Sequence, residues 1–374
     1  MKVIIACGGT GGHLFPGLAV AESLLARRHE VQLLVSEKSI DQQALTSWRR
    51  ADGSALAVHS LSAVGFDGSH RWTDSCFRLG RATRDCLDLC REYRPHAVLG
   101  MGGFTSAPAV LAARWGNGHR IPAVIHESNA IPGRANRWVG KLVNDVALGL
   151  ADCARFFGRR HVTVTGTPIR SALRRGRVAN AQQRLGLEFG RHTVLVMGGS
   201  QGAHAINETV VCALPWLADR AETIQFVHLS GDGDEEFVRE SYEKNGMVAK
   251  VMGFSDQMEL AYSAADLVIA RAGAATLTEI AAFGLPSILI PYPLAAGNHQ
   301  LCNARVLERA GAARVIEEAR LSGLHAERGE LLADSVMRLL DDEPVRQRMA
   351  AAVSQLDSPN AAERIADLLE QYAE

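Results

Sequence analysis

The chain has few cysteines, no excess of charge of either sign and no long hydrophobic run, and each absence excludes a class of protein. Its 374 residues include seven cysteines, none of them arranged as Cys-x-x-Cys. Zinc sites and disulfide frameworks use regularly spaced cysteines, so we expect neither, and the thiols fit a reducing, cytosolic compartment. With 40 Lys and Arg residues against 41 Asp and Glu residues, no overall field favours nucleic acid as a partner.

Long apolar stretches are also missing. The segment 281–293 is interrupted by Gly284, Pro286 and Pro291, and it falls short of the roughly 20 residues that span a bilayer. Only four apolar residues precede Cys7, fewer than the roughly 7 to 15 of a signal-peptide core. We therefore expect no export signal and no membrane-spanning helix, but a protein that is dissolved or at most peripheral to a membrane.

Short β-branched runs alternate with longer helical patterns through most of the sequence. This alternation is typical of βαβ units and parallel sheets, so the expected fold class is α/β. Because one domain commonly has about 100 to 200 residues, the length predicts two domains. In the first expected helix, Leu14, Leu18, Ala21 and Leu25 share one face and Pro16 suits the first helical position.

A glycine cluster, Gly8-Gly9-Thr10-Gly11-Gly12, comes directly after the first expected strand, Val3-Ile4-Ile5-Ala6, and is followed by His13. Backbone N–H groups in such a turn, and at the start of the next helix, bind phosphate at the carboxyl edge of a sheet. The cluster matches neither common nucleotide motif, because Leu14 replaces the third glycine of G-x-G-x-x-G and the Gly-Lys of a P-loop is missing. A purely structural turn is the alternative.

Two more polar turns follow strands in the first half. Gly100-Met101-Gly102-Gly103 follows one strand, and His126-Glu127-Ser128-Asn129 follows the strand expected at 121–125. Ligands bind at the carboxyl edge of such a sheet, so His13 and Glu127 are candidates for a general base, and Asn129 for a donor to a sugar or phosphate. The alternatives are a histidine satisfied at a helix start and ordinary loop polarity. A single His-Glu pair is not a complete metal site.

The second half repeats the opening pattern. A strand over 193–197 runs into Gly198-Gly199-Ser200-Gln201-Gly202. Further along, the strand 267–270 precedes a helix whose small first residues leave N–H groups open to phosphate, with Gly284 as a left-handed cap. Between the halves, a Gly/Pro-containing stretch near Gly166 reads as a linker. Arg170 there can bind phosphate through two parallel hydrogen bonds or form an ordinary surface ion pair.

Together these segments resemble the MurG family of bacterial N-acetylglucosaminyltransferases, and the resemblance covers nearly the whole chain. Its most specific motifs are Gly8 to His13 with Phe15-Pro16-Gly17-Leu18-Ala19, Gly100-Met101-Gly102-Gly103-Phe104, His126 to Asn129, Gly198 to Ala203, and Gly273 to Glu279. Small departures are Thr167-Pro168, where relatives often have Asn-Pro, and Asn298-His299-Gln300, where relatives often have charged residues.

The resemblance implies a GT-B fold, with two Rossmann-like doubly wound parallel-sheet domains facing a cleft. The first would span residues 1–166, the second, which binds UDP-GlcNAc, residues 167–357, and a last helix at about 358–374 would pack back onto the first. The implied reaction moves GlcNAc, with inversion, from UDP-GlcNAc to the muramoyl 4-hydroxyl of undecaprenyl-diphospho-muramoyl-pentapeptide, a step of peptidoglycan synthesis. No DxD metal motif accompanies it, so neither a metal nor another cofactor is expected.

Roles of individual positions follow, the catalytic and acceptor roles from the chemistry of the residues and the UDP-GlcNAc positions from the resemblance. His13 and Glu127 would be the catalytic residues, with the identity of the base left open between them. The acceptor diphosphate is assigned to Gly8, Gly9, Gly102 and Gly103. The positions matching the UDP-GlcNAc site are Thr10, Gly11, Gly12, Asn129, Arg170, Ser200, Ser255, Ala274, Ala275, Thr276, Leu277, Thr278, Glu279 and Gln300.

Within the UDP-GlcNAc set, the implied contacts differ from residue to residue. Arg170 and Ser200 would bind the diphosphate, and Ser255 would contact uracil through its backbone. Glu279 would bind ribose, and Gln300 would bind the sugar hydroxyls.

Because this acceptor is a membrane lipid, the first domain would meet the cytoplasmic face of the bacterial inner membrane as a peripheral protein. One helical stretch suits an anionic lipid surface, although an ordinary amphipathic helix explains it equally well. Its residues are Arg71, Trp72, Phe77, Arg78, Leu79, Arg81 and Arg84. Cell-wall or division proteins are further candidate partners.

Two other functions share part of this pattern. One is a GT-B glycolipid synthase with diacylglycerol as acceptor, which the glycine turns of the first half disfavour, since diacylglycerol carries no anion to bind. The other is a catalytically silent nucleotide-sugar sensor. The joint presence of His13, Glu127, Arg170 and Glu279 disfavours it.

Overall fold

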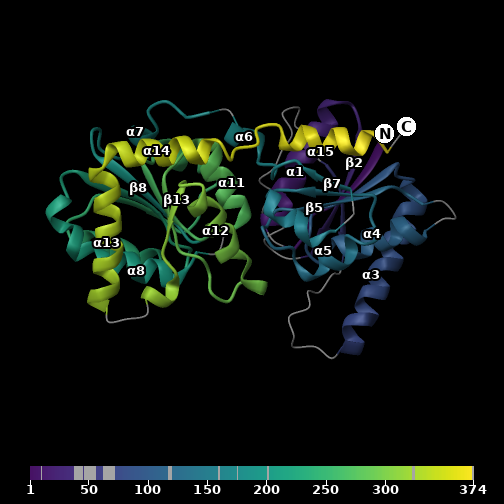
Figure 1. Ribbon diagram of the computed structural model, residues 1–374, viewed down its shortest axis with the longest axis horizontal. Coiled ribbons are helices and arrows are strands. Elements are labelled where there is room, and N and C mark those ends of the chain that lie inside the picture. Colours follow the sequence, from purple (N-terminus) through teal and green to yellow (C-terminus); the bar gives the residue numbers. More distant parts are fainter. Residues whose placement is uncertain are drawn as a thin grey trace. The chain divides into compact units, whose positions relative to one another are not determined.

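The computed structural model describes residues 1–9, 11–37, 45, 56–61, 72–116, 120–158, 161–174, 176–199, 202–321 and 325–372. It divides into two compact units, Met1–Ser171 with Ser358–Glu374, and Ala172–Asp357. Each unit is a parallel sheet with helices on both faces (Figure 1). The α/β fold class predicted from the sequence is confirmed.

The first unit contains a seven-stranded parallel sheet in the order β3-β2-β1-β4-β5-β6-β7. Its strands are β1 Lys2–Ala6, β2 Glu30–Ser36, β3 Ala57–Leu61, β4 Ala97–Gly100, β5 Ala123–Glu127, β6 Asp145–Leu148 and β7 His161–Val164. Its helices are α1 Gly11–Ala26, α3 Trp72–Tyr93, α4 Ser106–Trp115, α5 Arg134–Val139, the short 3-10 helix Ala151–Phe156, and α15 Ala361–Glu370. The strand order reverses between β1 and β4, which is where open α/β sheets bind ligands.

Alternate residues of β1 pack into two separate cores, one on each face of the sheet. Val3 and Ile5 lie in a cluster with residues of α1 and α15. Ile4 and Ala6 lie in the cluster on the other face, with residues of α3 and α4. A strand covered on both faces reads as a continuous apolar run, which is why Val3 to Ala6 has no polar residue.

Helix α1 begins at Gly11, so the prediction that Pro16 occupies the first helical position is wrong. Pro16 lies inside the helix, where it removes the hydrogen bond to the carbonyl of Gly12. Close packing explains why the helix continues past it. A Cβ on Gly17 would lie 2.5 Å from the Cβ of Cys7, so this part of the helix is pressed onto the end of β1.

The last helix, α15, belongs to the first unit. Ile365, Leu368 and Leu369 are buried in the cluster that contains the α1 side chains. On its polar side, Arg27, directly after α1, donates to Asp367 at 2.6 Å, and His29 lies 2.7 Å from Glu370. Apolar burial and ion pairs therefore fix the same helix–helix contact.

The second unit contains a six-stranded parallel sheet in the order β10-β9-β8-β11-β12-β13. Its strands are β8 His192–Met197, β9 Ile224–Leu229, β10 Ala249–Met252, β11 Leu267–Ala270, β12 Ser287–Leu289 and β13 Ala313–Val315. Its helices are α6 Ser171–Arg174, which starts at the last residue of the first unit, α7 Ala181–Arg184, α8 His204–Leu217, α9 Glu235–Lys244, α10 Met258–Ala264, α11 Ala274–Phe283, α12 His299–Arg309, α13 His325–Asp341 and α14 Glu343–Ser354. Short 3-10 helices lie at Ala218–Arg220, Ala296–Asn298 and Glu318–Leu321.

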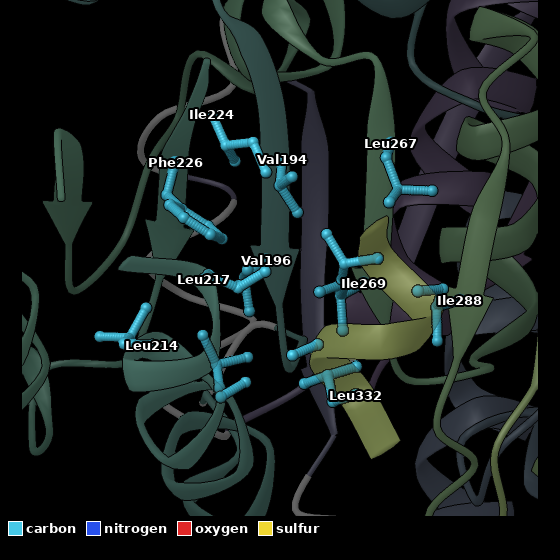
Figure 2. Packing of buried hydrophobic residues seen from close by; sticks show 14 of the residues in the cluster. Val194, Val196, Leu214, Leu217, Ile224, Phe226, Leu267, Ile269, Ile288 and Leu332 are labelled. Atoms are coloured by element: carbon cyan, nitrogen blue, oxygen red, sulfur yellow. The ribbon is translucent and has the colours of Figure 1, made fainter. Parts of the chain in front are cut away.

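The core of the second unit lies between the central strands and the helices α8 and α13. Val196 and Ile269 project from the strands toward Leu217 and Leu332 (Figure 2). Helix α11 ends at Gly284 in the left-handed conformation, with φ 62°, which confirms the cap predicted from the sequence. None of the helices in the described ranges combines the length and apolar character that a bilayer crossing requires.

Candidate functional site

The first glycine turn joins the carboxyl end of β1 to α1 through backbone conformations that need glycine. A Cβ on Gly8 would lie 2.2 Å from the backbone N of Ser36 at the end of β2, and Gly9 has φ 113°. Thr10 lies outside the described residues. Gly11 and Gly12 begin α1, so their N–H groups have no acceptor within the helix and point out at its positive end. The turn is therefore suited to an anion.

The ring of His13 lies against the second glycine turn, which follows β4. A Cβ on Gly102 would lie 3.0 Å from His13 Cδ2, and a Cβ on Gly103 would lie 2.9 Å from His13 Nδ1. Both glycines have positive φ, 99° and 71°. The missing side chains make room for the imidazole, so the two glycine turns and His13 form one site. His13 itself is half-buried.

Glu127, the last residue of β5, is only 3% exposed and accepts four hydrogen bonds. Its Oε1 accepts from the backbone N and the Nδ2 of Asn129, at 3.0 and 2.9 Å. Its Oε2 accepts from the backbone N of Gly133 and the Nδ2 of Asn136, at 3.0 and 2.9 Å. Two bonds on each oxygen use the normal accepting capacity of a carboxylate. This arrangement orders the loop 128–136.

His126, beside Glu127, is a neutral structural imidazole. The ring is completely buried, and desolvation lowers its pKa to about 4, although the carbonyl of Gly166 and the charge of Glu127 act in the opposite direction. Its Nε2 lies 3.0 Å from the Gly166 carbonyl oxygen, and its Nδ1 lies 3.3 Å from Ser128 Oγ. It therefore ties the end of β5 to the stretch that the sequence predicts as a linker.

Arg170 is placed by an aromatic ring that the sequence reasoning did not assign to the site. The guanidinium carbon lies 4.6 Å from the centroid of the Phe15 ring on α1, a cation–π contact. A Cβ on Gly11 would lie 3.2 Å from the same ring, so Arg170 is close to the first glycine turn. Among the described residues, the buried Nε of Arg170 has no hydrogen-bond partner. A buried N–H of this kind is suited to an anionic ligand.

Asn136 is a second residue of this region that the sequence reasoning missed. It is 4% exposed, and its Oδ1 has no hydrogen-bond partner in the described part of the chain. A Cβ on Gly102 would lie 3.4 Å from Asn136 Nδ2, so this side chain reaches the turn that contacts His13. Asn136 lies nine residues after Glu127, on the next helix, and no motif in the sequence marks it as part of the site.

The second unit has its own glycine turn after β8. Gly199 and Gly202 have positive φ, 107° and 73°, and a Cβ on Gly202 would lie 2.2 Å from the carbonyl oxygen of Ser230. The tight approach to the end of β9 requires glycine. Ser200 and Gln201 lie outside the described residues, and α8 begins at His204.

Helix α11 begins one residue after Gly273, at the carboxyl end of β11. The N–H groups of Ala274, Ala275 and Thr276 are the first of the helix and have no acceptor within it. The next N–H, that of Leu277, donates to the carbonyl of Gly273, and the Leu277 side chain is buried. The Thr278 hydroxyl donates to the carbonyl of Ala274 at 2.9 Å. The first three residues therefore form an end of this helix that is suited to an anion.

Three other predicted residues lie in loops and helices of the same unit. The Oε1 of Gln300 accepts from the backbone N of Ala272 at 3.2 Å and of Tyr292 at 2.9 Å, which fixes its amide plane. The Oγ of Ser255 accepts from the backbone N of Gln257 at 3.2 Å. Glu279 is half-buried on α11.

The stretch predicted to meet a membrane is part of α3. Phe77 is 76% exposed, and the side chains of Arg81 and Arg84 are exposed on the same helix. Leu79 instead packs against the core. Arg71 and the side chain of Trp72 lie outside the described residues. In the ranges that the structure describes, no three His, Cys, Asp or Glu side chains gather into a possible metal site.

Comparison with known proteins identifies the family. Residues 3–148 match the glycosyltransferase family 28 N-terminal domain, and residues 193–365 match the family 28 C-terminal domain. The chain is 39% identical over 369 residues to the UDP-N-acetylglucosamine--N-acetylmuramyl-(pentapeptide) pyrophosphoryl-undecaprenol N-acetylglucosamine transferase of Geobacter sulfurreducens, covering 98% of this chain and 97% of that protein. It is 36% identical to the protein of the same name from Thermodesulfovibrio yellowstonii, covering 99% and 98%.

Solved structures agree with this assignment. The crystal structure of Acinetobacter baumannii MurG matches with a TM-score of 0.76 and 28% identity, over 99% of each chain. The UDP-GlcNAc 2-epimerase of Neisseria meningitidis matches with a TM-score of 0.71 at 13% identity, which shows a shared fold alone. The resemblance inferred from the sequence motifs is confirmed. The chain belongs to the MurG family of family 28 glycosyltransferases.

Proposed function

We propose that this chain transfers N-acetylglucosamine, with inversion, from UDP-GlcNAc to the muramoyl 4-hydroxyl of undecaprenyl-diphospho-muramoyl-pentapeptide. Similarity over nearly the full length to transferases with this name supports the reaction. The observation that carries the chemistry is the packing of the His13 ring against Gly102 and Gly103, at the carboxyl edge of the sheet. It combines an imidazole with two turns suited to an anion.

In the proposed mechanism, His13 is the base. The acceptor 4-hydroxyl oxygen attacks the anomeric carbon of GlcNAc, its proton passes to the imidazole, and the bond from that carbon to the UDP oxygen breaks. Attack from the face opposite the leaving group gives inversion. An imidazole is suited to this task because it accepts a proton near neutral pH.

Glu127 acts as a positioning residue in this proposal. All four hydrogen bonds to its oxygens come from protein groups, so accepting a substrate proton would require one of them to break. Its bonds orient Asn129, the residue assigned to the donor by family resemblance. The carboxylate therefore supports the site without taking part in proton transfer.

The leaving diphosphate gains negative charge as the bond breaks. The N–H groups at the start of α11, the glycine turn after β8 with Ser200, and Arg170 stabilise that charge in the proposal. The unpartnered Nε of Arg170 supports its share of this role. The same family positions assign Thr10, Gly11 and Gly12 to the donor, Ser255 to uracil, Glu279 to ribose and Gln300 to the sugar.

The acceptor is bound at the first glycine turns, with Gly8, Gly9, Gly102 and Gly103 facing its diphosphate. We place the protein at the cytoplasmic face of the inner membrane, held peripherally through the exposed Phe77, Arg81 and Arg84 of α3. Co-sedimentation with anionic vesicles at low salt tests this surface. Equal recovery with neutral vesicles would contradict it.

A UDP-release assay tests the reaction. The protein is incubated with UDP-GlcNAc and lipid-linked muramoyl-pentapeptide, and UDP is measured against a reaction without acceptor. Acceptor-dependent release supports the proposal. Release with diacylglycerol instead would identify a glycolipid synthase, and tight UDP-GlcNAc binding without release would identify a sensor. Either result overturns it.

A further inference from the structure

Tyr262, on α10, holds the carboxylate of Glu279 through a partly buried hydrogen bond. Its hydroxyl donates to Glu279 Oε2 at 2.7 Å, and Tyr262 is fully buried. Glu279 is half-buried, so one end of its carboxylate is held by a buried side chain while the residue still borders solvent.

Contacts with two other elements, α11 and β8, fix the position of the Tyr262 ring. It stacks on Phe283, with ring centroids 5.1 Å apart and planes at 26°. Phe283 lies four residues after Glu279 on α11, so both lie on the helix face that Tyr262 covers. The Tyr262 hydroxyl also lies 3.5 Å from the Sδ of Met197, the last residue of β8 before the glycine turn. The hydroxyl is therefore held at a junction of α10, α11 and β8.

We propose that Tyr262 is a positioning residue that orders Glu279 for binding the ribose of the donor nucleotide. This inference rests on the proposed function, in which Glu279 contacts ribose. A glutamate that borders solvent and lacks an anchor samples several rotamers and loses that freedom when a ligand binds. The hydrogen bond from the Tyr262 hydroxyl already restricts the rotamers of Glu279 in the free protein, so less conformational entropy is lost when the nucleotide binds. Its loss should weaken nucleotide binding and leave the chemical step unchanged.

The test compares Tyr262→Phe with Tyr242→Phe. Tyr242, on α9, is equally buried, and its hydroxyl lies 3.0 Å from His228 Nδ1, so the control also loses one hydrogen bond of a buried tyrosine. For Tyr262→Phe we expect KM for UDP-GlcNAc to rise about five- to twenty-fold, with kcat within about two-fold of wild type. For Tyr242→Phe we expect KM to stay within about two-fold. Thermal unfolding of both variants shows whether they remain folded.

A second readout separates the ribose role from a general loosening of the fold. UDP and its 2′-deoxy and 3′-deoxy analogues are titrated against wild type, Tyr262→Phe and Glu279→Gln. We expect wild type to prefer UDP over at least one analogue and both variants to lose most of that preference. If wild type shows no preference, the assignment of Glu279 to ribose in the proposed function fails. If wild type and Glu279→Gln differ but Tyr262→Phe behaves as wild type, only the role of Tyr262 is overturned.

Discussion

The two units share one structural device and surround it with different side chains. In each, a strand ends in a glycine turn followed by a helix, at Gly8–Gly12 in the first unit and Gly198–Gly202 in the second. In the first unit, the helix delivers His13 against a further glycine turn, which Asn136, a hydrogen-bond donor to Glu127, also approaches. In the second, Glu279 is half-buried and anchored at one oxygen by a tyrosine.

The difference shows that the turn and the side chains around it supply separate properties. Glycine turns and helix starts provide N–H groups for anions in both units. The first unit adds a group that can accept a proton, and the second adds groups that can orient a nucleotide. We therefore expect substitution of His13 in the first unit to lower kcat and substitution of Glu279 in the second to raise KM for UDP-GlcNAc.

The largest expected effect is that of His13→Ala. If His13 is the base, kcat should fall by about 10²- to 10⁴-fold, because a positioned acid–base group contributes this much. KM for UDP-GlcNAc should stay within about two-fold, since the substitution removes no proposed donor contact. His161→Ala, at an exposed position on β7, is the control and should leave both constants unchanged. A kcat within a few-fold of wild type would remove His13 from the base role.

Glu127→Gln should destabilise the first unit by about 2–3 kcal/mol, because an amide nitrogen would face either the Gly133 and Asn136 donors or those of Asn129. Urea unfolding measures this cost. Glu222→Gln, at a position 92% exposed, is the matched control and should have no effect.

The pH profile of kcat in Glu127→Gln separates the two candidate bases. If His13 is the base, the profile keeps its shape while kcat falls. Loss of its acidic limb would instead assign the proton transfer to Glu127.

Lowering the pH should destabilise both units, because each contains one buried imidazole that is neutral in the folded chain. Burial lowers the pKa of His126 to about 4 and that of His228 to about 3, so both rings are neutral in the folded chain at pH 5. On unfolding they regain an ordinary pKa near 6.5 and bind protons. The free energy of unfolding should therefore fall as pH drops below about 6.5, by about 2 kcal/mol per ring between pH 7 and pH 5.

Hydrogen exchange at several pH values measures the acid effect on the stability of each unit separately. His126→Gln should reduce the pH dependence in the first sheet only, and His228→Gln in the second only. An unchanged pH dependence in both variants would show that other groups govern acid unfolding.

The smallest expected effect is that of Gly102→Ala. The new Cβ would meet the His13 ring at 3.0 Å, and φ of 99° strains any L-residue, so kcat should fall about ten-fold. Gly311→Ala is the control, since φ there is 72° and no atom lies within 4 Å of the added Cβ. It should lower the unfolding temperature without changing kcat. Equal kcat values for the two variants would contradict the close packing of His13 on this turn.

Much of the fold follows from the sequence because each local pattern has one physical solution. The apolar runs at 3–6 and 267–270 have no polar face, which fits strands buried on both sides. Gly284 follows an apolar helix, where a left-handed cap favours glycine. Pro16 misled the prediction, because the packing of Gly17 on Cys7 keeps the helix continuous through a residue that usually starts one.

The sequence by itself determined the two α/β domains, the glycine turns at strand ends and the family, since these depend on residue type and order along the chain. Only the tertiary structure decided which side chains are fixed and by what. Folding surrounds the Glu127 carboxylate with hydrogen-bond donors from residues 129–136 and places the Phe15 ring against the Arg170 guanidinium. It also brings Tyr262 to Glu279, which lies 17 residues further along the sequence. Such contacts depend on how helices pack on a sheet, and spacing along the chain does not encode that packing.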